Sequence, residues 1–299
     1  MLNPAKVRLA IAPIAWTNDD MPELGKDNTF LQTISEIALA GYTGCEIGCQ
    51  FPRDPVILNR ELGRRGLQLV TAWYSAYLNT KPYYEVADGF VQHMNFLKAV
   101  GAKQVMVSDQ SFSIQHKRDK AVLDDKNYLS SARQWQQLAD GLQRLGQLAV
   151  EADMQLVYHH HMGTTVQTTE EIDRLMALTD PRYVNLLFDT GHLTFSGENP
   201  LDILTRHFDR IKHIHLKDVR PTVREQVKRD KLCFLDAVRA SVFTVPGDGC
   251  VDFPAVFNIL EARGYTGWVV VEAEQDPDKA NPFDYAVMAR HYIRQQTGL

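Results

Sequence analysis

Four short stretches in the second half of the chain combine histidine with aspartate or glutamate. They read HHH at 159–161, DTGH at 189–192, HIHLKD at 213–218 and EAE at 272–274. Each stretch completes or follows an apolar run that is typical of a buried β-strand, so polar side chains gather where strands end. Side chains alternate along a strand, and each stretch can therefore present one metal ligand and one neighbour on the same face.

Imidazole and carboxylate groups in this combination are ligands for a divalent metal ion. Mixed nitrogen and oxygen donors suit Mn²⁺, Co²⁺, Fe²⁺ or Zn²⁺, and these stretches contain no cysteine that would form a thiolate site. We predict a metal site that holds Mn²⁺ or Co²⁺. The alternative, a hydrogen-bonded histidine cluster with surface carboxylates, explains any single stretch equally well but explains all four together poorly.

The elements that must position these side chains alternate between strand and helix along the chain. Strands are predicted at residues 7–14, 43–47, 67–73, 104–108, 155–159, 184–189, 211–215 and 268–272. Amphipathic patterns predict helices at residues 29–40, 56–65, 86–100, 133–152, 169–178, 201–207, 253–263 and 283–295.

Eight strand-then-helix units in 299 residues predict an α/β fold, a single (β/α)8 TIM barrel domain over residues 1–299. An open doubly wound sheet is the alternative, but no strand-to-helix turn carries a glycine-rich nucleotide motif. In a barrel the carboxyl ends of the strands meet on one side, so the four polar stretches should converge there. One long connection, residues 219–250, follows the seventh strand and is interpreted as a lid or an oligomer contact.

Composition excludes several classes of protein. No apolar run approaches the roughly 20 residues that span a bilayer, and polar residues interrupt the N-terminal apolar stretch that an export signal would need. The net charge of −5 comes without a long basic run, which argues against a nucleic-acid partner. The four cysteines form no CxxC pair. We expect a cytoplasmic protein with a small-molecule substrate and no membrane or nucleic-acid partner, and homo-oligomer formation stays open.

The motifs FDTGH, HIHLKD and VVVEAE at the ends of predicted strands six to eight resemble those of xylose isomerase-like barrels. That superfamily contains sugar isomerases, ketose epimerases and endonuclease-type enzymes. Longer motifs at residues 11–25, 156–168, 243–253 and 269–282 are similar to those of the inosose dehydratase family of myo-inositol catabolism, over nearly the whole chain. This resemblance implies a cytoplasmic hydro-lyase that uses Mn²⁺ or Co²⁺ to convert scyllo-inosose (2-keto-myo-inositol) into 3,5/4-trihydroxycyclohexane-1,2-dione. It also implies a response to glutathione.

The superfamily's metal ligands are Glu, Asp, His and Glu from strands five to eight. Position by position, the resemblance assigns Asp189, His215 and Glu272 to the last three, whereas His159 stands where the first glutamate is expected. This departure removes a negative charge and a carboxylate that the epimerases use as acid or base. His161 is the alternative first ligand, or it orients a ligand or binds substrate.

Loss of water β to a ketone requires a base for the weakly acidic α-proton, a cation for the developing enolate and an acid for the departing hydroxyl. We predict that Glu272 is the base as well as a ligand. His192 is the candidate proton donor or substrate contact. Lys217 either stabilises the enediolate or forms an ion pair with Asp218 or Glu274.

The first half of the chain supplies candidates for binding a polyol, which needs an apolar platform and several polar partners. We predict Trp16 as the platform, with Asn18 and Glu46 as hydroxyl partners. Trp73 is either a second platform or, slightly favoured, a core residue. The remaining histidines, at positions 93, 116, 207 and 291, are interpreted as structural.

Two other functions stay open. A ketose isomerase or epimerase of the same superfamily would form the same enediolate but keep every oxygen, and a metal-binding sugar sensor would need no base. The histidine at position 159 and the long motifs favour the dehydratase.

Overall fold

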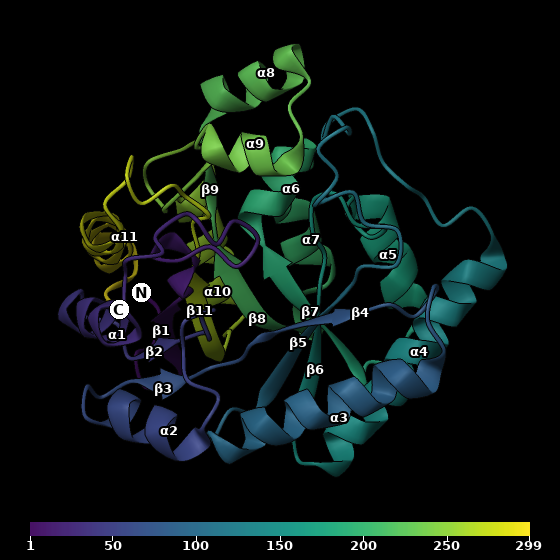
Figure 1. Ribbon diagram of the computed structural model, residues 1–299, viewed down its shortest axis with the longest axis horizontal. Coiled ribbons are helices and arrows are strands. Elements are labelled where there is room, and N and C mark those ends of the chain that lie inside the picture. The colour runs from purple at the N-terminus through teal and green to yellow at the C-terminus, as the bar shows by residue number, and fades with distance from the viewer.

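Parallel strands curl into a barrel with helices on its outside in the computed structural model, which describes residues 1–299 (Figure 1). The strands are β1 Val7–Ile11, β2 Gly44–Cys45, β3 Gln68–Leu69, β4 Trp73–Ala76, β5 Gln104–Asp109, β6 Gln155–His159, β7 Val184–Asp189, β8 Ile211–Leu216 and β11 Gly267–Val271. Their order in the sheet is β3-β2-β1-β11-β8-β7-β6-β5-β4. All eight predicted strand regions are confirmed as parts of this sheet.

One continuous segment closes the barrel. Strands β3 and β4 stand at opposite ends of the sheet order, yet only residues 70–72 separate them in the chain. Strand β3 pairs with β2, and β4 pairs with β5. Between them the Thr71 hydroxyl donates to the Gln104 carbonyl and accepts from the Met106 N–H. The third predicted strand is therefore an interrupted strand that runs to residue 76 and joins both edges.

The eight predicted helices are confirmed with ends shifted by a few residues. They are α1 Phe30–Leu39, α2 Pro55–Gly63, α3 Tyr83–Ala99, α4 Ala132–Glu151, α5 Thr169–Leu178, α7 Pro200–Arg206, α10 Phe253–Ala262 and α11 Pro282–Thr297. In α4, Leu138, Leu142 and Leu145 recur at helical spacing and are buried against the barrel. Capping boxes at Ser131 and Thr168 satisfy the first N–H groups of α4 and α5.

The long connection after β8 contains structure that the sequence pattern did not indicate. It forms β9 Asp218–Val219, α8 Pro221–Asp230, α9 Phe234–Arg239 and β10 Phe243–Thr244, and β9 pairs antiparallel with β10. Helices α8 and α9 stand together at one end of the barrel (Figure 1). Helix α8 buries only Val227, so it lacks the apolar periodicity that reveals a helix.

A further short helix, α6 Thr190–Ser196, was also not predicted. It begins directly after β7, because the Asp189 carboxylate accepts the His192 N–H and caps it.

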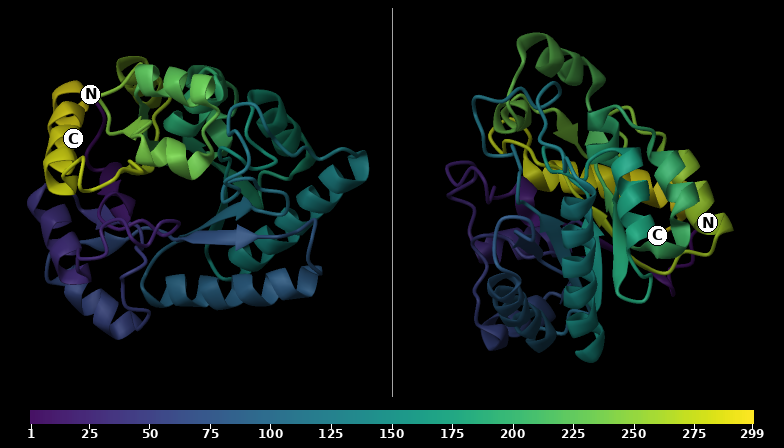
Figure 2. Two further views of the ribbon diagram at one scale, coloured as in Figure 1. Left: turned by 45° about the horizontal axis from the view of Figure 1, so that its top comes forward. Right: turned by 90° about the vertical axis from the view of Figure 1, so that its right-hand side faces the viewer.

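Two large hydrophobic clusters, of four in all, support the barrel. The larger contains 62 buried residues between Leu2 and Ile293, and the smaller joins the connection after β8 to residues such as Met162 and Phe195. The Leu2 N–H donates to the Thr297 carbonyl, so the two chain ends lie side by side (Figure 2). None of the helices is both long enough and apolar enough to cross a bilayer.

Candidate active site

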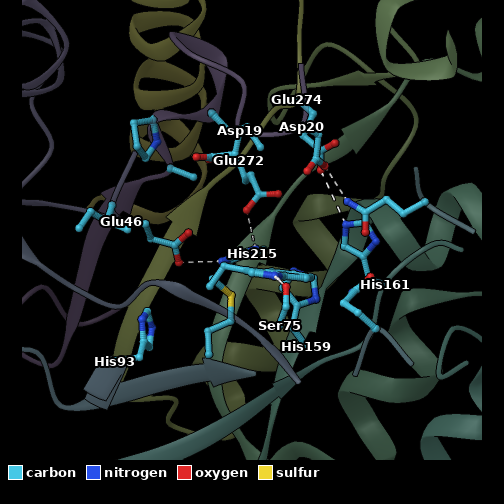
Figure 3. Close-up of a pocket in the computed structure, with 18 of the residues that line it drawn as sticks. Asp19, Asp20, Glu46, Ser75, His93, His159, His161, His215, Glu272 and Glu274 are labelled. Carbon is cyan, nitrogen blue, oxygen red and sulfur yellow. Dashed lines mark hydrogen bonds and ion pairs between the residues drawn. The ribbon is translucent and has the colours of Figure 1, made fainter. Parts of the chain in front are cut away.

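A cavity of about 580 Å³ lies where the carboxyl ends of the strands meet (Figure 3). Its titratable lining residues come from both halves of the chain: Asp19, Asp20, Glu46, Arg53, His93, His116, His159, His161, His215, Glu272 and Glu274. Parallel strands in a closed barrel direct their carboxyl ends to one side, which explains the convergence of residues so distant in sequence.

Four buried groups have the spacing of a metal coordination sphere. His215 Nδ1 lies 2.8 Å from Glu272 Oε2 and 3.5 Å from Asp189 Oδ2, and His159 Nε2 lies 3.9 Å from the same Asp189 oxygen. Neighbouring donors around a metal with bonds of about 2.1 Å stand roughly 3 to 3.5 Å apart, a range that contains one of these three distances and lies between the other two. The structure therefore brings together the four residues predicted as ligands.

The hydrogen bonding of these groups also fits a cation. Asp189 Oδ2 and His215 Nδ1 are buried and make no hydrogen bond, since the approach of His215 Nδ1 to Glu272 Oε2 lacks the alignment of one, and this is costly for polar atoms unless something else satisfies them. His159 Nδ1 donates to the His160 carbonyl, so the lone pair of this imidazole is on Nε2, the nitrogen that faces Asp189. The residues present suit a divalent metal.

Lys217 lies fully buried beside these groups. Its ammonium contacts Glu272 Oε1, lies 2.8 Å from Glu274 Oε1 and donates to His192 Nε2 over 2.9 Å. These three acceptors use all three N–H groups of an ammonium. Neither Lys217 nor His192 lines the cavity, so both stand one layer behind the groups that can touch a substrate.

Of the two ion-pair partners considered for Lys217, Glu274 is the one in contact. Asp218 instead accepts four backbone N–H groups, from Val219, Gly247, Gly249 and Val251, at 2.8 to 3.2 Å. It thereby fastens the end of the long connection to the strand that carries Lys217.

Burial and ion pairing set the charges of the carboxylates. Burial raises the pKa of Glu272, but the charges of Lys217 and His215 outweigh it and hold that pKa well below its usual value. Burial raises the pKa of Glu274 to about 7, with Lys217 opposing the rise and Glu272 adding to it. The two carboxyls on one strand thus differ strongly in basicity.

The cationic groups respond in opposite ways. Burial disfavours the charged form of Lys217, but Glu272 and Glu274 outweigh it and raise the pKa of the ammonium. Burial lowers the pKa of His161 to about 4 and that of His192 well below its usual value. Since His161 Nδ1 donates to the Met162 carbonyl, its neutral ring presents Nε2 as an acceptor in the cavity.

The long connection forms an apolar wall behind this half of the site. The Phe243 ring lies 4.7 Å from Lys217 Nζ and 5.2 Å from the His192 ring, and the Phe234 ring lies 5.3 Å from His161. The 219–250 segment therefore excludes water from the buried ion pairs, a role within the chain that the sequence did not indicate.

The structure corrects two predicted substrate contacts. Strand β1 ends at Ile11, and a 3₁₀ turn at Pro13–Ala15 carries Trp16 out of the cavity, where its indole N–H donates to Glu36 over 2.6 Å. The Asn18 side-chain oxygen caps a turn, because it accepts the backbone N–H groups of Asp20 and Met21 at 2.9 Å each. Neither residue lines the cavity.

Residues that were not predicted to belong to the site also line the cavity. Trp73, for which a core position was slightly favoured over a platform role, forms an aromatic wall 5.4 Å from the His159 ring. His93 and His116, interpreted as structural, also line it, and His116 Nε2 lies 2.8 Å from Asp20 Oδ1. Asp20 comes from the loop after β1 and His116 from the loop after β5, a meeting that no local pattern announces. Glu274 could have been found, because it follows Glu272 by two residues.

A closed parallel barrel with imidazole and carboxylate donors gathered at its carboxyl end defines a TIM barrel protein whose site can hold a divalent metal ion. The chain belongs to the xylose isomerase-like TIM barrel family, whose model matches residues 34–295. The solved structure of the IolI protein with a bound zinc atom has the same fold, with a TM-score of 0.71 at 15% identity over 98% of this chain and 100% of that one.

Within that family the chain belongs to the inosose dehydratases. It is 55% identical over 298 residues to the inosose dehydratase of Clostridium beijerinckii and 56% identical over 299 residues to that of Geobacillus thermodenitrificans. Each match covers 100% of both chains.

Proposed function

We propose that this chain is a hydro-lyase that removes one water molecule from scyllo-inosose to give 3,5/4-trihydroxycyclohexane-1,2-dione in myo-inositol breakdown. The full-length identity of 55% and 56% to inosose dehydratases carries the proposal. The enclosed cavity supports it, because a polyhydroxylated ring needs many fixed polar partners and an apolar face, here Trp73.

The metal in this proposal is Mn²⁺ or Co²⁺, held by His159, Asp189, His215 and Glu272. When bound, such an ion supplies a Lewis acid that makes the protons next to the ketone easier to remove. The spacing of the four groups and the two orphaned buried atoms support this donor set.

We assign the proton transfers to Glu274 rather than to Glu272. Both oxygens of Glu272 are engaged, Oε1 by Lys217 and Oε2 by His215, whereas only Oε1 of Glu274 is paired. Glu274 lines the cavity and can take the α-proton. The same carboxyl then returns that proton to the hydroxide leaving from the next carbon, so water departs and the enol tautomerises to the dione.

The neighbouring histidines and the lysine support this step. His161 Nε2 lies 3.9 Å from Glu274 Oε1 and accepts the hydrogen of a substrate hydroxyl. Lys217 holds Glu272 and Glu274 in place through ion pairs, and His192 Nε2 orients the Lys217 ammonium by accepting one of its hydrogen bonds. In this proposal Lys217 and His192 position the carboxylates and do not touch substrate.

The test is to follow the ultraviolet absorbance of the dione while protein reconstituted with Mn²⁺ or Co²⁺ acts on scyllo-inosose, with and without reduced glutathione. We expect absorbance to rise and to stop rising after a chelator is added. Glu274→Gln should lose turnover while still binding metal, whereas Asp189→Ala should lose both. Recovery of an isomeric ketose with no absorbance change would identify an isomerase instead.

A further inference from the structure

A series of polar side chains, buried except for the half-buried Gln104, runs behind His215, away from the candidate metal ligands. His215 Nε2 lies 2.9 Å from Glu46 Oε1, and His213 Nε2 lies 3.0 Å from the same oxygen. His213 Nδ1 in turn lies 2.8 Å from Gln104 Oε1, and Gln104 Nε2 donates to the Lys212 carbonyl over 2.7 Å. Figure 3 shows the contact between Glu46 and His215.

Gln104, at the far end of this series of side chains, fixes the direction of the hydrogen bonds along it. Because Gln104 Nε2 donates to a carbonyl, its Oε1 must face His213 and accept. His213 Nδ1 therefore carries a proton. A neutral imidazole has only one N–H, so His213 Nε2 is an acceptor unless it holds a second proton.

Glu46 Oε1 thus meets two ring nitrogens at hydrogen-bond distance. Two acceptors cannot face each other in a buried site, so one proton lies between Glu46 and His213. The pair together is then neutral, as carboxylate and imidazolium or as acid and imidazole. In either form Glu46 Oε1 still accepts from His215 Nε2. With His215 Nε2 donating, Nδ1 is the nitrogen that faces Asp189 and Glu272, and its lone pair becomes available to a metal once Nδ1 has lost its proton.

We propose that Glu46 and His213 are positioning residues that hold His215 with Nδ1 toward a divalent metal, and that Gln104 fixes the orientation of His213. This revises the expectation that Glu46 binds a substrate hydroxyl. It rests on the metal site of the proposed function. Carboxylates that accept from a ligating imidazole usually change metal affinity or activity 10- to 100-fold when they are lost.

The position of His213 makes the proposal testable. Its side chain is fully buried and does not line the cavity, so it does not touch substrate, and its ring nitrogens face only Gln104 and Glu46. If Glu46 bound a substrate hydroxyl, His213 would have no effect on metal binding. If Glu46 positions His215, substitutions of Glu46 and of His213 should both weaken metal binding.

The experiment measures Co²⁺ binding by titration calorimetry and the visible absorption spectrum of bound Co²⁺, without any substrate. We expect Glu46→Gln and His213→Asn each to weaken Co²⁺ binding about 10- to 100-fold and to change the spectrum. Gln104→Met, a milder change at the far end, should weaken it less. His93→Asn is the matched control, because His93 lines the same cavity and its one hydrogen bond is to the Ala72 carbonyl, at 3.2 Å.

The outcomes separate the inference from the proposed function. If Glu46→Gln raises only KM, and Co²⁺ binds the folded His213→Asn and Gln104→Met proteins as it binds the unaltered chain, the positioning role is wrong. If the variants weaken Co²⁺ binding but no preparation forms the dione, the positioning role stands and the dehydratase proposal fails. Circular dichroism of each variant shows that it is folded.

Discussion

Replacing Gly191 by alanine tests whether packing around Lys217 outweighs local helix preference. Gly191 is the second residue of α6, where alanine is ordinarily the better residue by about 1 kcal/mol. A Cβ atom on Gly191 would stand 2.4 Å from Lys217 Cγ, 2.6 Å from its Cβ and 2.7 Å from its Cδ. These atoms are the root of the side chain, so they cannot swing away as a free end could.

The magnitude follows from the two opposed effects. Forcing an extra carbon into a packed core costs about 1–3 kcal/mol and sometimes more. The Lys217 ammonium is held by Glu272, Glu274 and His192, so a displaced stem also strains those contacts. Subtracting the helix gain of about 1 kcal/mol leaves a net loss of about 0–2 kcal/mol in the free energy of unfolding, and the strained contacts of Lys217 increase this loss. Turnover should fall as well, because the carboxylates lose their fixed cation.

The assay is urea unfolding of the metal-free protein, with the slope of the transition checked to be unchanged. Gly63→Ala is the control, since Gly63 lies in α2 and a Cβ there would meet nothing within 4 Å. That variant should be as stable as the parent or more stable by up to about 1 kcal/mol. If Gly191→Ala matches Gly63→Ala in stability and keeps full turnover, the packing argument around Lys217 is refuted.

Three further substitutions probe other parts of the site. Lys217→Met should destabilise the metal-free protein by about 3–5 kcal/mol, because buried Glu272 and Glu274 lose their cation; unfolding in urea measures this, and a loss below about 1 kcal/mol contradicts it. Asp218→Asn turns an NH₂ group toward two of four backbone N–H donors and should lower the free energy of unfolding by about 2 kcal/mol or more. Faster hydrogen exchange at Gly249 would show that the stability is lost at this turn, and unchanged exchange would argue against it. Trp73→Leu should raise KM without changing Co²⁺ affinity; weaker metal binding would show that Trp73 supports the ligands rather than the substrate.

Local pattern was sufficient for most of the fold. Apolar runs and amphipathic periods located all eight strand regions and the eight main helices, because both depend on side-chain spacing within a single element. The pattern failed at α6, α8 and α9. Helices α6 and α9 are short, and α8 buries a single residue, so tertiary contacts stabilise what periodicity could not reveal.

Trp16 and Trp73 show why the substrate side of the cavity was harder to predict. Both follow a strand or belong to one, yet the 3₁₀ turn after β1 sends Trp16 to α1 while the interrupted third strand brings Trp73 into the cavity. The direction of each side chain depends on where its strand stops, which is the least certain feature of a sequence-based reading.

By itself, the sequence determined that strands five to eight each end in imidazole or carboxylate groups on one face, and the barrel then requires those ends to meet. Only the tertiary structure decided what those groups do to one another. Glu46 reaches His215 across 169 residues of sequence, and Lys217 finds Glu274 across 57. These groups are buried between the barrel and the 219–250 segment, so each contact matters for stability, because a charge removed from water is stable only when partners of opposite charge or hydrogen-bonding groups surround it.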